Sequence, residues 1–168
     1  MFHVVYVSRA SRQLVSAELL DLLEVSRRRN GRLLLTGLLL YANGKFMQVL
    51  EGREQPVREV YASILADTRH TDINTLRLQE TPARHFPDWT MAFGDLDAPE
   101  PAVTDDDAKI VAETNIVRSI ASHIPATPGL SKFLEPGFKS PTLRDESSDV
   151  YQLLRAFRDE NTSAENVR

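Results

Sequence analysis

A single amide side chain, Gln48, interrupts an otherwise apolar strand pattern. The alternation places Phe46, Gln48 and Leu50 on one face of the strand and Met47 and Val49 on the other. An amide on a core face costs roughly a few kcal/mol unless its donor and acceptor atoms find partners. A second side chain, a buried water or a bound ligand that offers both a donor and an acceptor would each satisfy Gln48.

Other polar residues also occupy positions where the periodicity predicts apolar ones: Tyr6, Ser8, Asn30, Asp67, Arg69 and His70. Taken singly, Tyr6 could be a core tyrosine, Asn30 a helix C-cap and Asp67 one half of a surface ion pair. Taken together, they could line a slot between two helices that pack on one face of a sheet. A flat heteroaromatic ring with carbonyl and imide groups would fit such a slot.

The elements that would position these residues follow from hydrophobic periodicity. The pattern predicts strands at 3–8, 33–41, 45–51, 73–80 and 89–93, with helices at 16–30 and 56–70. This β-α-β-β-α-β-β order predicts an α+β, ferredoxin-like fold, with a five-stranded mixed sheet and two helices on one of its faces.

Turn and cap residues set the expected bounds of these elements. Asn43-Gly44 suits the positive φ angles of a tight hairpin. Ser16 is the expected N-cap of the first helix and Gly31 its C-terminal stop, while Pro56 suits the first turn of the second helix. The stripe of the second helix is expected to bury Val57, Val60, Tyr61, Ile64 and Leu65.

The composition changes near Asp95, so the sequence predicts two parts, a domain at 1–96 and a helical extension at 97–168. Apolar stripes predict helices at 105–124 and 149–159, separated by a proline-rich loop. We expect the first of these helices to cover the apolar sheet face that carries Met47 and Val49, because monomers rarely expose large apolar patches.

Composition excludes several classes of function. The 168 residues contain no cysteine, which rules out disulfides, thiolate chemistry and Cys-ligated metal sites, and the residues after 96 contain no metal-spaced cluster. A net charge of −4 argues against nucleic-acid binding. The apolar runs are too short to cross a membrane, and residues 1–5 lack the basic start of a signal peptide, so a cytoplasmic protein is predicted.

Several motifs follow one another in the first part of the chain: Tyr6-Val7-Ser8-Arg9, Asn30, Thr36-Gly37-Leu38-Leu39-Leu40-Tyr41, Phe46-Met47-Gln48-Val49-Leu50-Glu51-Gly52, Asp67-Thr68-Arg69-His70 and Phe86-Pro87-Asp88-Trp89-Thr90-Met91. Through these motifs the chain resembles BLUF domains, the blue-light sensors that use FAD, and the resemblance covers residues 1–96. The separations of 42 residues from Tyr6 to Gln48 and 41 from Gln48 to Trp89 are also those of the family.

The resemblance implies roles by position. Tyr6 would donate an electron and a proton, Gln48 would rearrange, and Trp89 or Met91 would relay the change. The implied cofactor-binding residues are Tyr6, Ser8, Arg29, Asn30, Gln48, Asp67, Arg69 and His70. FAD is the implied cofactor, and the same ring contacts would accept FMN or riboflavin.

The leading hypothesis is therefore a photoreceptor that has no catalytic site and signals to an unidentified effector protein, as a homo-oligomer (a dimer or larger). The alternative is an acylphosphatase-like hydrolase on the same fold, with Arg9 as a phosphate ligand. That alternative leaves Gln48, Asp67 and Trp89 without a role.

Overall fold

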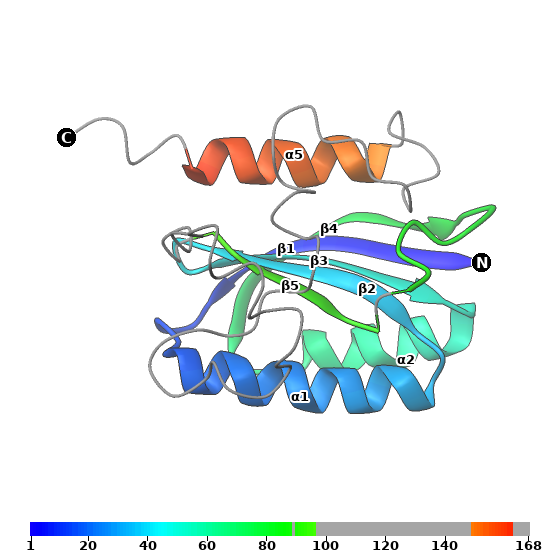
Figure 1. Ribbon diagram of the computed structural model, residues 1–168, viewed down its shortest axis with the longest axis horizontal. Helices are drawn as coiled ribbons and strands as arrows, with labels where there is room; N and C mark the ends of the chain where they lie inside the picture. The colour runs from blue at the N-terminus through cyan, green and yellow to red at the C-terminus, as the bar shows by residue number, and fades with distance from the viewer. Residues whose placement is uncertain (89, 97–148, 163–168) are drawn as a thin grey trace, which may run out of the picture.

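The computed structural model describes residues 1–88, 90–96 and 149–162 (Figure 1). Its elements are β1 (Phe2–Ala10), α1 (Ser16–Arg32), β2 (Thr36–Ala42), β3 (Lys45–Gly52), α2 (Glu54–Leu65), β4 (His70–Glu80), β5 (Ala92–Asp95) and α5 (Asp149–Thr162). The strands form one sheet in the order β4-β1-β3-β2-β5, in which β2 and β5 are parallel and the other neighbours antiparallel. The predicted ferredoxin-like, mixed five-stranded architecture is confirmed.

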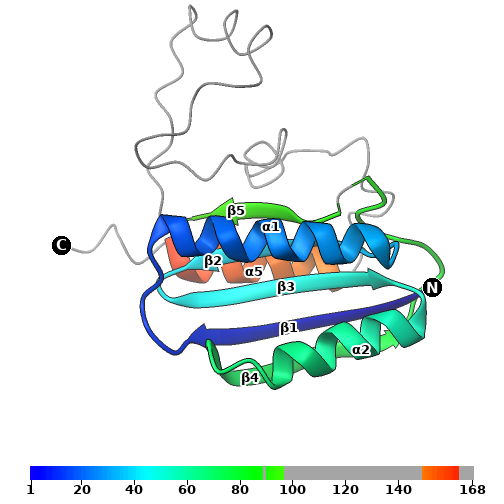
Figure 2. The ribbon, with the colours of Figure 1, turned by 90° about the horizontal axis from the view of Figure 1, so that it is seen from below.

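Helices cover both faces of the sheet. Helices α1 and α2 lie on one face and α5 on the other (Figures 1 and 2). Because successive side chains of a strand point to opposite faces of the sheet, a separate hydrophobic core forms on each face, as the sequence predicts. On the α1/α2 side the core includes Val4, Tyr6, Leu19, Leu23, Phe46, Leu50, Val57, Val60, Tyr61, Ile64, Met91 and Phe93. On the α5 side it includes Val5, Leu38, Leu40, Met47, Val49, Phe86, Val150, Tyr151, Leu154 and Phe157.

The hairpin between β2 and β3 sets the register of the central strand. Asn43 and Gly44 both have positive φ, 51° and 71°, as the Asn-Gly signal predicts. This turn places Gln48 opposite Leu39 of β2, and the separate pairing of β3 with β1 places Gln48 opposite Tyr6. Gln48 therefore lies at the middle of the sheet, on the face that α1 and α2 cover.

The predicted cap residues of α1 were wrong at both ends. Val15 is the N-cap, and Ser16 is already helical. Gly31 does not stop the helix, which continues to Arg32; the residue with positive φ is Leu34, at 54°. Because Leu34 and Leu35 form the turn that leaves the helix, with the amide of Leu35 donating to the carbonyl of Asn30, β2 begins at Thr36 rather than at residue 33.

Two further boundaries differ from the prediction. Helix α2 ends at Leu65, which is 53% exposed, so Leu65 is outside the buried stripe. Asp67 and Arg69 therefore lie in the turn after α2, and His70 begins β4. The last strand begins at Ala92, so Met91 precedes β5 instead of lying within a strand at 89–93.

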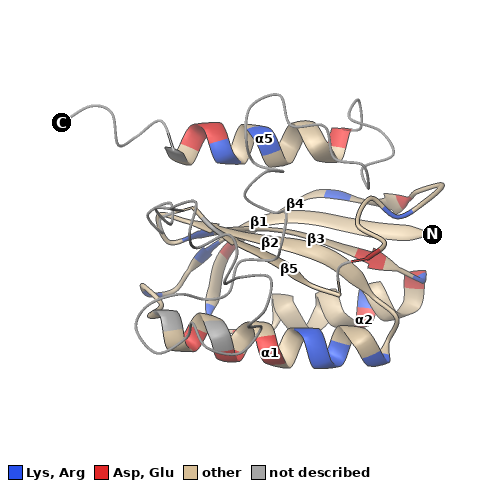
Figure 3. Ribbon diagram, in the orientation of Figure 1, with Lys and Arg blue, Asp and Glu red and all other residues tan. Residues whose placement is uncertain are grey.

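The helix on the second face is α5, which begins where the helix at 149–159 was predicted and continues to Thr162. The helix predicted at 105–124 lies outside the described residues. Arg77 Nε pairs with Asp149 Oδ2 at 2.5 Å at the start of α5, and Lys45 Nζ donates to Asn161 Oδ1 at 3.2 Å near its end. Among the described residues, the charged ones lie mainly on the helices and near the strand ends (Figure 3). None of the described helices has both the length and the apolar character needed to span a membrane.

Candidate functional site

A chain of three side chains crosses the sheet beneath α1 and α2. The Tyr6 hydroxyl donates a hydrogen bond to Gln48 Oε1, and Gln48 Nε2 donates to Met91 Sδ at 3.4 Å. All three residues are buried. The lone amide of the strand pattern therefore has a partner at each end, one from β1 and one from the residue that precedes β5.

Burial fixes the protonation state of Tyr6. Desolvation is the main cause that raises the pKa of its hydroxyl, and Tyr61, whose ring centroid lies 5.3 Å away, adds to the effect. The charge of Arg29 lowers this pKa and that of Asp67 raises it. Tyr6 is therefore a neutral hydrogen-bond donor, and residues from α1 and from the turn after α2 both act on it.

Helix α1 holds the segment that carries Met91. Asn30 Nδ2 donates to the Thr90 carbonyl at 3.1 Å, and Arg27 Nε donates to the Met91 carbonyl at 3.0 Å. These side-chain bonds take the place of a strand ladder, which explains why β5 does not include Thr90 and Met91, although the predicted strand at 89–93 did. Arg27 was not among the predicted site residues, although its i, i+3 spacing from Asn30 places both on one face of the helix.

Two buried polar atoms beside this chain have no partner among the described residues. They are Asn30 Oδ1 and Arg29 Nε. Arg29 also reaches toward α2, where its Nη1 donates to Ser63 Oγ at 2.9 Å. Because buried polar atoms are nearly always hydrogen-bonded, this acceptor and this donor indicate that a polar ligand binds beside α1.

The remaining predicted residues gather at the start of β4. Arg69 Nη2 pairs with Asp67 Oδ2 at 2.6 Å, and this bond is the main cause that lowers the pKa of Asp67 to about 2. His70 Nδ1 and Ser8 Oγ lie 2.9 Å apart, and burial lowers the pKa of His70. A cavity of about 200 Å³ opens here, lined by Leu14, Glu18, Asp21, Leu22, Phe46, Arg69 and His70.

The described residues fit a flavin ring. The amides of Asn30 and Gln48 offer both donors and acceptors, and Arg69 offers a cation beside an apolar wall that includes Phe46. Carbonyl and imide groups at a ring edge need this combination. Of the predicted site residues, only Trp89 lies outside the described part of the chain, so Met91 is the candidate relay that the structure places beside Gln48.

The comparison with protein families decides what this arrangement is. The profile of "BLUF: Sensors of blue-light using FAD" matches residues 1–92. The chain belongs to the BLUF family. Residues 1–92 are a BLUF domain, a sensor of blue light that uses FAD, and the matches give no support to the acylphosphatase-like alternative.

Two curated relatives resemble about half of the chain. The chain is 38% identical over 87 residues to photoactivated adenylate cyclase subunit beta of Euglena longa. This match covers 51% of the present chain and 10% of that protein. The chain is 37% identical over 76 residues to the blue light- and temperature-regulated antirepressor BluF of Escherichia coli (strain K12). This match covers 45% of the present chain and 19% of that protein. The chain thus spans a fifth or less of the length of these two relatives.

A solved structure gives fuller coverage. The dark-state structure of BlrB, a BLUF protein, matches with 36% identity and a TM-score of 0.54. This match covers 56% of the present chain and 71% of BlrB. The BLUF fold of this chain is therefore supported both by its sequence and by its three-dimensional arrangement.

Proposed function

We propose that Tyr6 and Gln48 are the light-responsive pair of this photoreceptor and that Met91 is the first residue to sense a change at Gln48. The observation that carries the proposal is the position of the Gln48 amide. Its oxygen accepts from the Tyr6 hydroxyl, and its nitrogen donates to Met91 Sδ. A change at Tyr6 can therefore reach the segment before β5 through one side chain.

The chemistry of the pair suits a switch. A flavin, when bound, absorbs blue light and is a strong oxidant in its excited state. The buried, protonated Tyr6 hydroxyl can supply an electron together with its proton. Gln48 has a donor end and an acceptor end, so rotation or tautomerisation of its amide exchanges its partners without a change in net charge. Either change would alter the contact with Met91.

The flavin would be held by residues on both sides of this pair. Asn30 and Arg29 would meet the carbonyl and imide edge of the ring, because each has a buried polar atom without a partner among the described residues. Asp67, Arg69 and His70 would hold the opposite side of the ring and the ribityl chain, with Ser8 fixing the His70 imidazole. FMN or riboflavin would satisfy the same ring contacts. Trp89 keeps its proposed relay role together with Met91.

The output would be a protein–protein interaction. In this proposal, residues 1–96 sense light and residues 97–168 carry the signal to an effector protein, in a cytoplasmic homo-oligomer without enzymatic activity in these residues. Two relatives support a sensor that is separable from its output, because one is named an adenylate cyclase and the other an antirepressor, so similar sensors occur with different outputs. The position of helix α5 supports a role for the extension. Residues of α5 share a buried cluster with Met47 and Val49, which are the neighbours of Gln48 on β3.

The replacement of Gln48 by leucine tests the proposal. Gln48→Leu removes the donor and the acceptor but keeps an apolar side chain of similar size, so the protein should remain yellow and lose the reversible red shift under blue light. Gln13→Leu makes the same chemical change at an exposed position and should behave like the unaltered protein. A normal red-shifted photoproduct in Gln48→Leu would rule out the role assigned to Gln48.

A further inference from the structure

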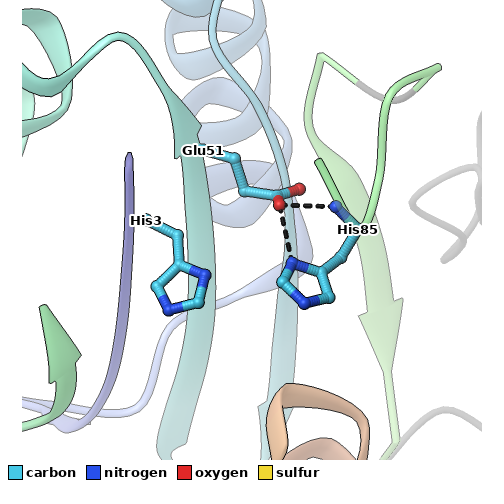
Figure 4. Close-up of side chains that lie close together, drawn as sticks. All are labelled: His3, Glu51 and His85. Carbon is cyan, nitrogen blue, oxygen red and sulfur yellow. Dashed lines mark hydrogen bonds and ion pairs between the residues drawn. The ribbon is translucent and has the colours of Figure 1, made fainter. Parts of the chain in front are cut away.

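A second polar cluster lies on the opposite face of the sheet, on the side of α5. His3 of β1 and Glu51 of β3 stand directly opposite each other in the antiparallel ladder, and they are 2% and 0% exposed. His85, from the segment between β4 and β5, completes the cluster, and its side chain is 15% exposed (Figure 4). Neither His3 nor His85 takes part in the flavin site.

The Glu51 carboxylate already fastens the segment that precedes β5. Its Oε2 accepts from the backbone amide of His85 at 2.6 Å and lies 2.9 Å from His85 Nδ1, while its Oε1 accepts from the amide of Phe86 at 2.9 Å. A carboxylate has about four acceptor positions, so one remains. Among the described residues His85 is the one ion-pair partner of this carboxylate, and a fully buried negative charge normally requires more compensation.

The His3 imidazole lacks hydrogen-bond partners. Neither of its ring nitrogens has a hydrogen-bond partner among the described residues, although the ring is almost fully buried. Its ring centroid lies 5.4 Å from that of His85, and one ligand atom from each of His3, Glu51 and His85 lies within 4.8 Å of the others. A buried imidazole without a partner is costly, and here it faces a carboxylate and a second imidazole.

We propose that His3, Glu51 and His85 bind a divalent transition-metal ion, with Zn²⁺ as the expected occupant. Two imidazole nitrogens and a carboxylate oxygen form a common ligand set for Zn²⁺, whereas Mg²⁺ and Ca²⁺ prefer oxygen ligands alone. Bond lengths of about 2.0–2.2 Å place tetrahedral ligand atoms about 3.4 Å apart. The separations between the three ligand atoms, which are at most 4.8 Å, must therefore shorten by up to about 1.4 Å. The partly exposed edge of His85 provides a path for the ion and for a water as the fourth ligand.

The ion would join three parts of the chain. His3 belongs to β1, Glu51 to β3, and His85 to the segment that continues to Met91, so one ion would cross-link the sheet to the segment that carries the candidate relay. Because the ligands gather only in the folded chain, binding should raise the thermal unfolding temperature as the metal concentration increases.

Zinc uptake by the untagged, full-length protein tests the site. The protein, stripped with a chelator and dialysed, is titrated with Zn²⁺ by calorimetry and by competition with a chromogenic chelator. We expect one Zn²⁺ per chain, a raised unfolding temperature, and no competition from excess Mg²⁺ or Ca²⁺. A protein that takes up no Zn²⁺, or takes it up without thermal stabilisation, would overturn the proposal.

Variants assign the ion to this cluster. His3→Leu and His85→Gln should each weaken Zn²⁺ binding by at least about tenfold, because even indirect supporting groups contribute 10–100-fold to metal affinity. His3→Leu breaks no hydrogen bond among the described residues, because neither ring nitrogen of His3 has a partner there, so the variant should fold and keep its flavin spectrum. Gln79→Ala changes the residue opposite His3 on β4 and should bind Zn²⁺ normally. Unchanged affinity in both histidine variants would place the ion elsewhere and refute the assignment.

Discussion

Tyr6 stands directly opposite Gln48 on neighbouring antiparallel strands, and its hydroxyl donates a hydrogen bond to the glutamine oxygen. The strand that carries Gln48 turns its next side chains, Met47 and Val49, toward α5 on the other face. One central strand therefore contacts both layers. A displacement of this strand after a change at Gln48 would alter its packing contacts on both faces of the sheet.

The first prediction concerns the Tyr6 hydroxyl. Tyr6→Phe should keep the fold and the flavin but abolish the light-induced red shift, because it removes the electron and proton source. It should also cost about 1–3 kcal/mol of stability, since Gln48 Oε1 loses its donor. Absorbance under blue light and chemical denaturation measure the two effects. Tyr61→Phe is the matched control: its hydroxyl bonds Thr75 Oγ1 rather than Gln48, so its red shift should persist.

The second prediction concerns the unpaired oxygen of Asn30. Asn30→Ala should weaken flavin binding by about 1–3 kcal/mol, because a buried carbonyl or imide group of the ring would lose its partner. Fluorescence titration of the apoprotein with FAD measures the change. Arg27→Ala is the comparison, because Arg27 also holds a backbone carbonyl of the segment at residues 90–91 but is not proposed to meet the ring. Equal losses in the two variants would mean that Asn30 acts only through that segment.

Residues with strict alternation or a clear turn signal were predictable from the sequence. The strands around Gln48 and the Asn43-Gly44 hairpin follow from local rules, and the two faces of β3 separate as the alternation predicts. The convergence of Tyr6 with Gln48 was also predictable, because both lie on the same face of strands that the ferredoxin-like order makes neighbours.

Features that depend on long-range contacts were not predictable in this way. The strand at 89–93 was misplaced because Asn30 and Arg27 bind the carbonyls of Thr90 and Met91, which no local pattern reveals. The α1 boundary was misplaced because Leu34, not a glycine, adopts the left-handed conformation. The cluster of His3, Glu51 and His85 was missed, since its members are far apart in the sequence and lack a metal-binding spacing.

The third prediction concerns pH. Burial, with a smaller contribution from Arg69, lowers the pKa of His70 below its ordinary 6.5, whereas Asp67 opposes the shift. The unfolded chain therefore binds a proton more readily than the folded chain, so stability from His70 is complete above pH 6.5 and is lost as the pH falls below it. His70→Gln, which can keep a bond to Ser8, should show a shallower loss. Denaturation at several pH values, with a chelator present, measures the difference; parallel curves would contradict the prediction.

The fourth prediction concerns the covered sheet face. Val150, Leu154 and Phe157 of α5 pack on a face that includes Met47 and Val49. Leu154→Asp places a charge in this contact and should loosen α5 while the α1/α2 side stays intact. We expect the variant to keep its red shift and to show faster hydrogen exchange in α5. Unchanged exchange in α5 would mean that the helix is held by its ends, through Asp149 and Asn161.

The final prediction separates a signalling extension from a simple cover. Truncation after Asp95 removes α5, and the uncovered face would expose a patch of roughly several hundred Å², so the fragment needs a solubilising fusion. If the extension carries the signal, the fragment should keep its red shift but show no light-dependent change in oligomeric state or effector binding. Both properties are measured in darkness and under blue light, for the fragment and for the full-length fusion. If those changes survive both the truncation and Leu154→Asp, the extension is only a cover and the output surface lies on the sensor itself.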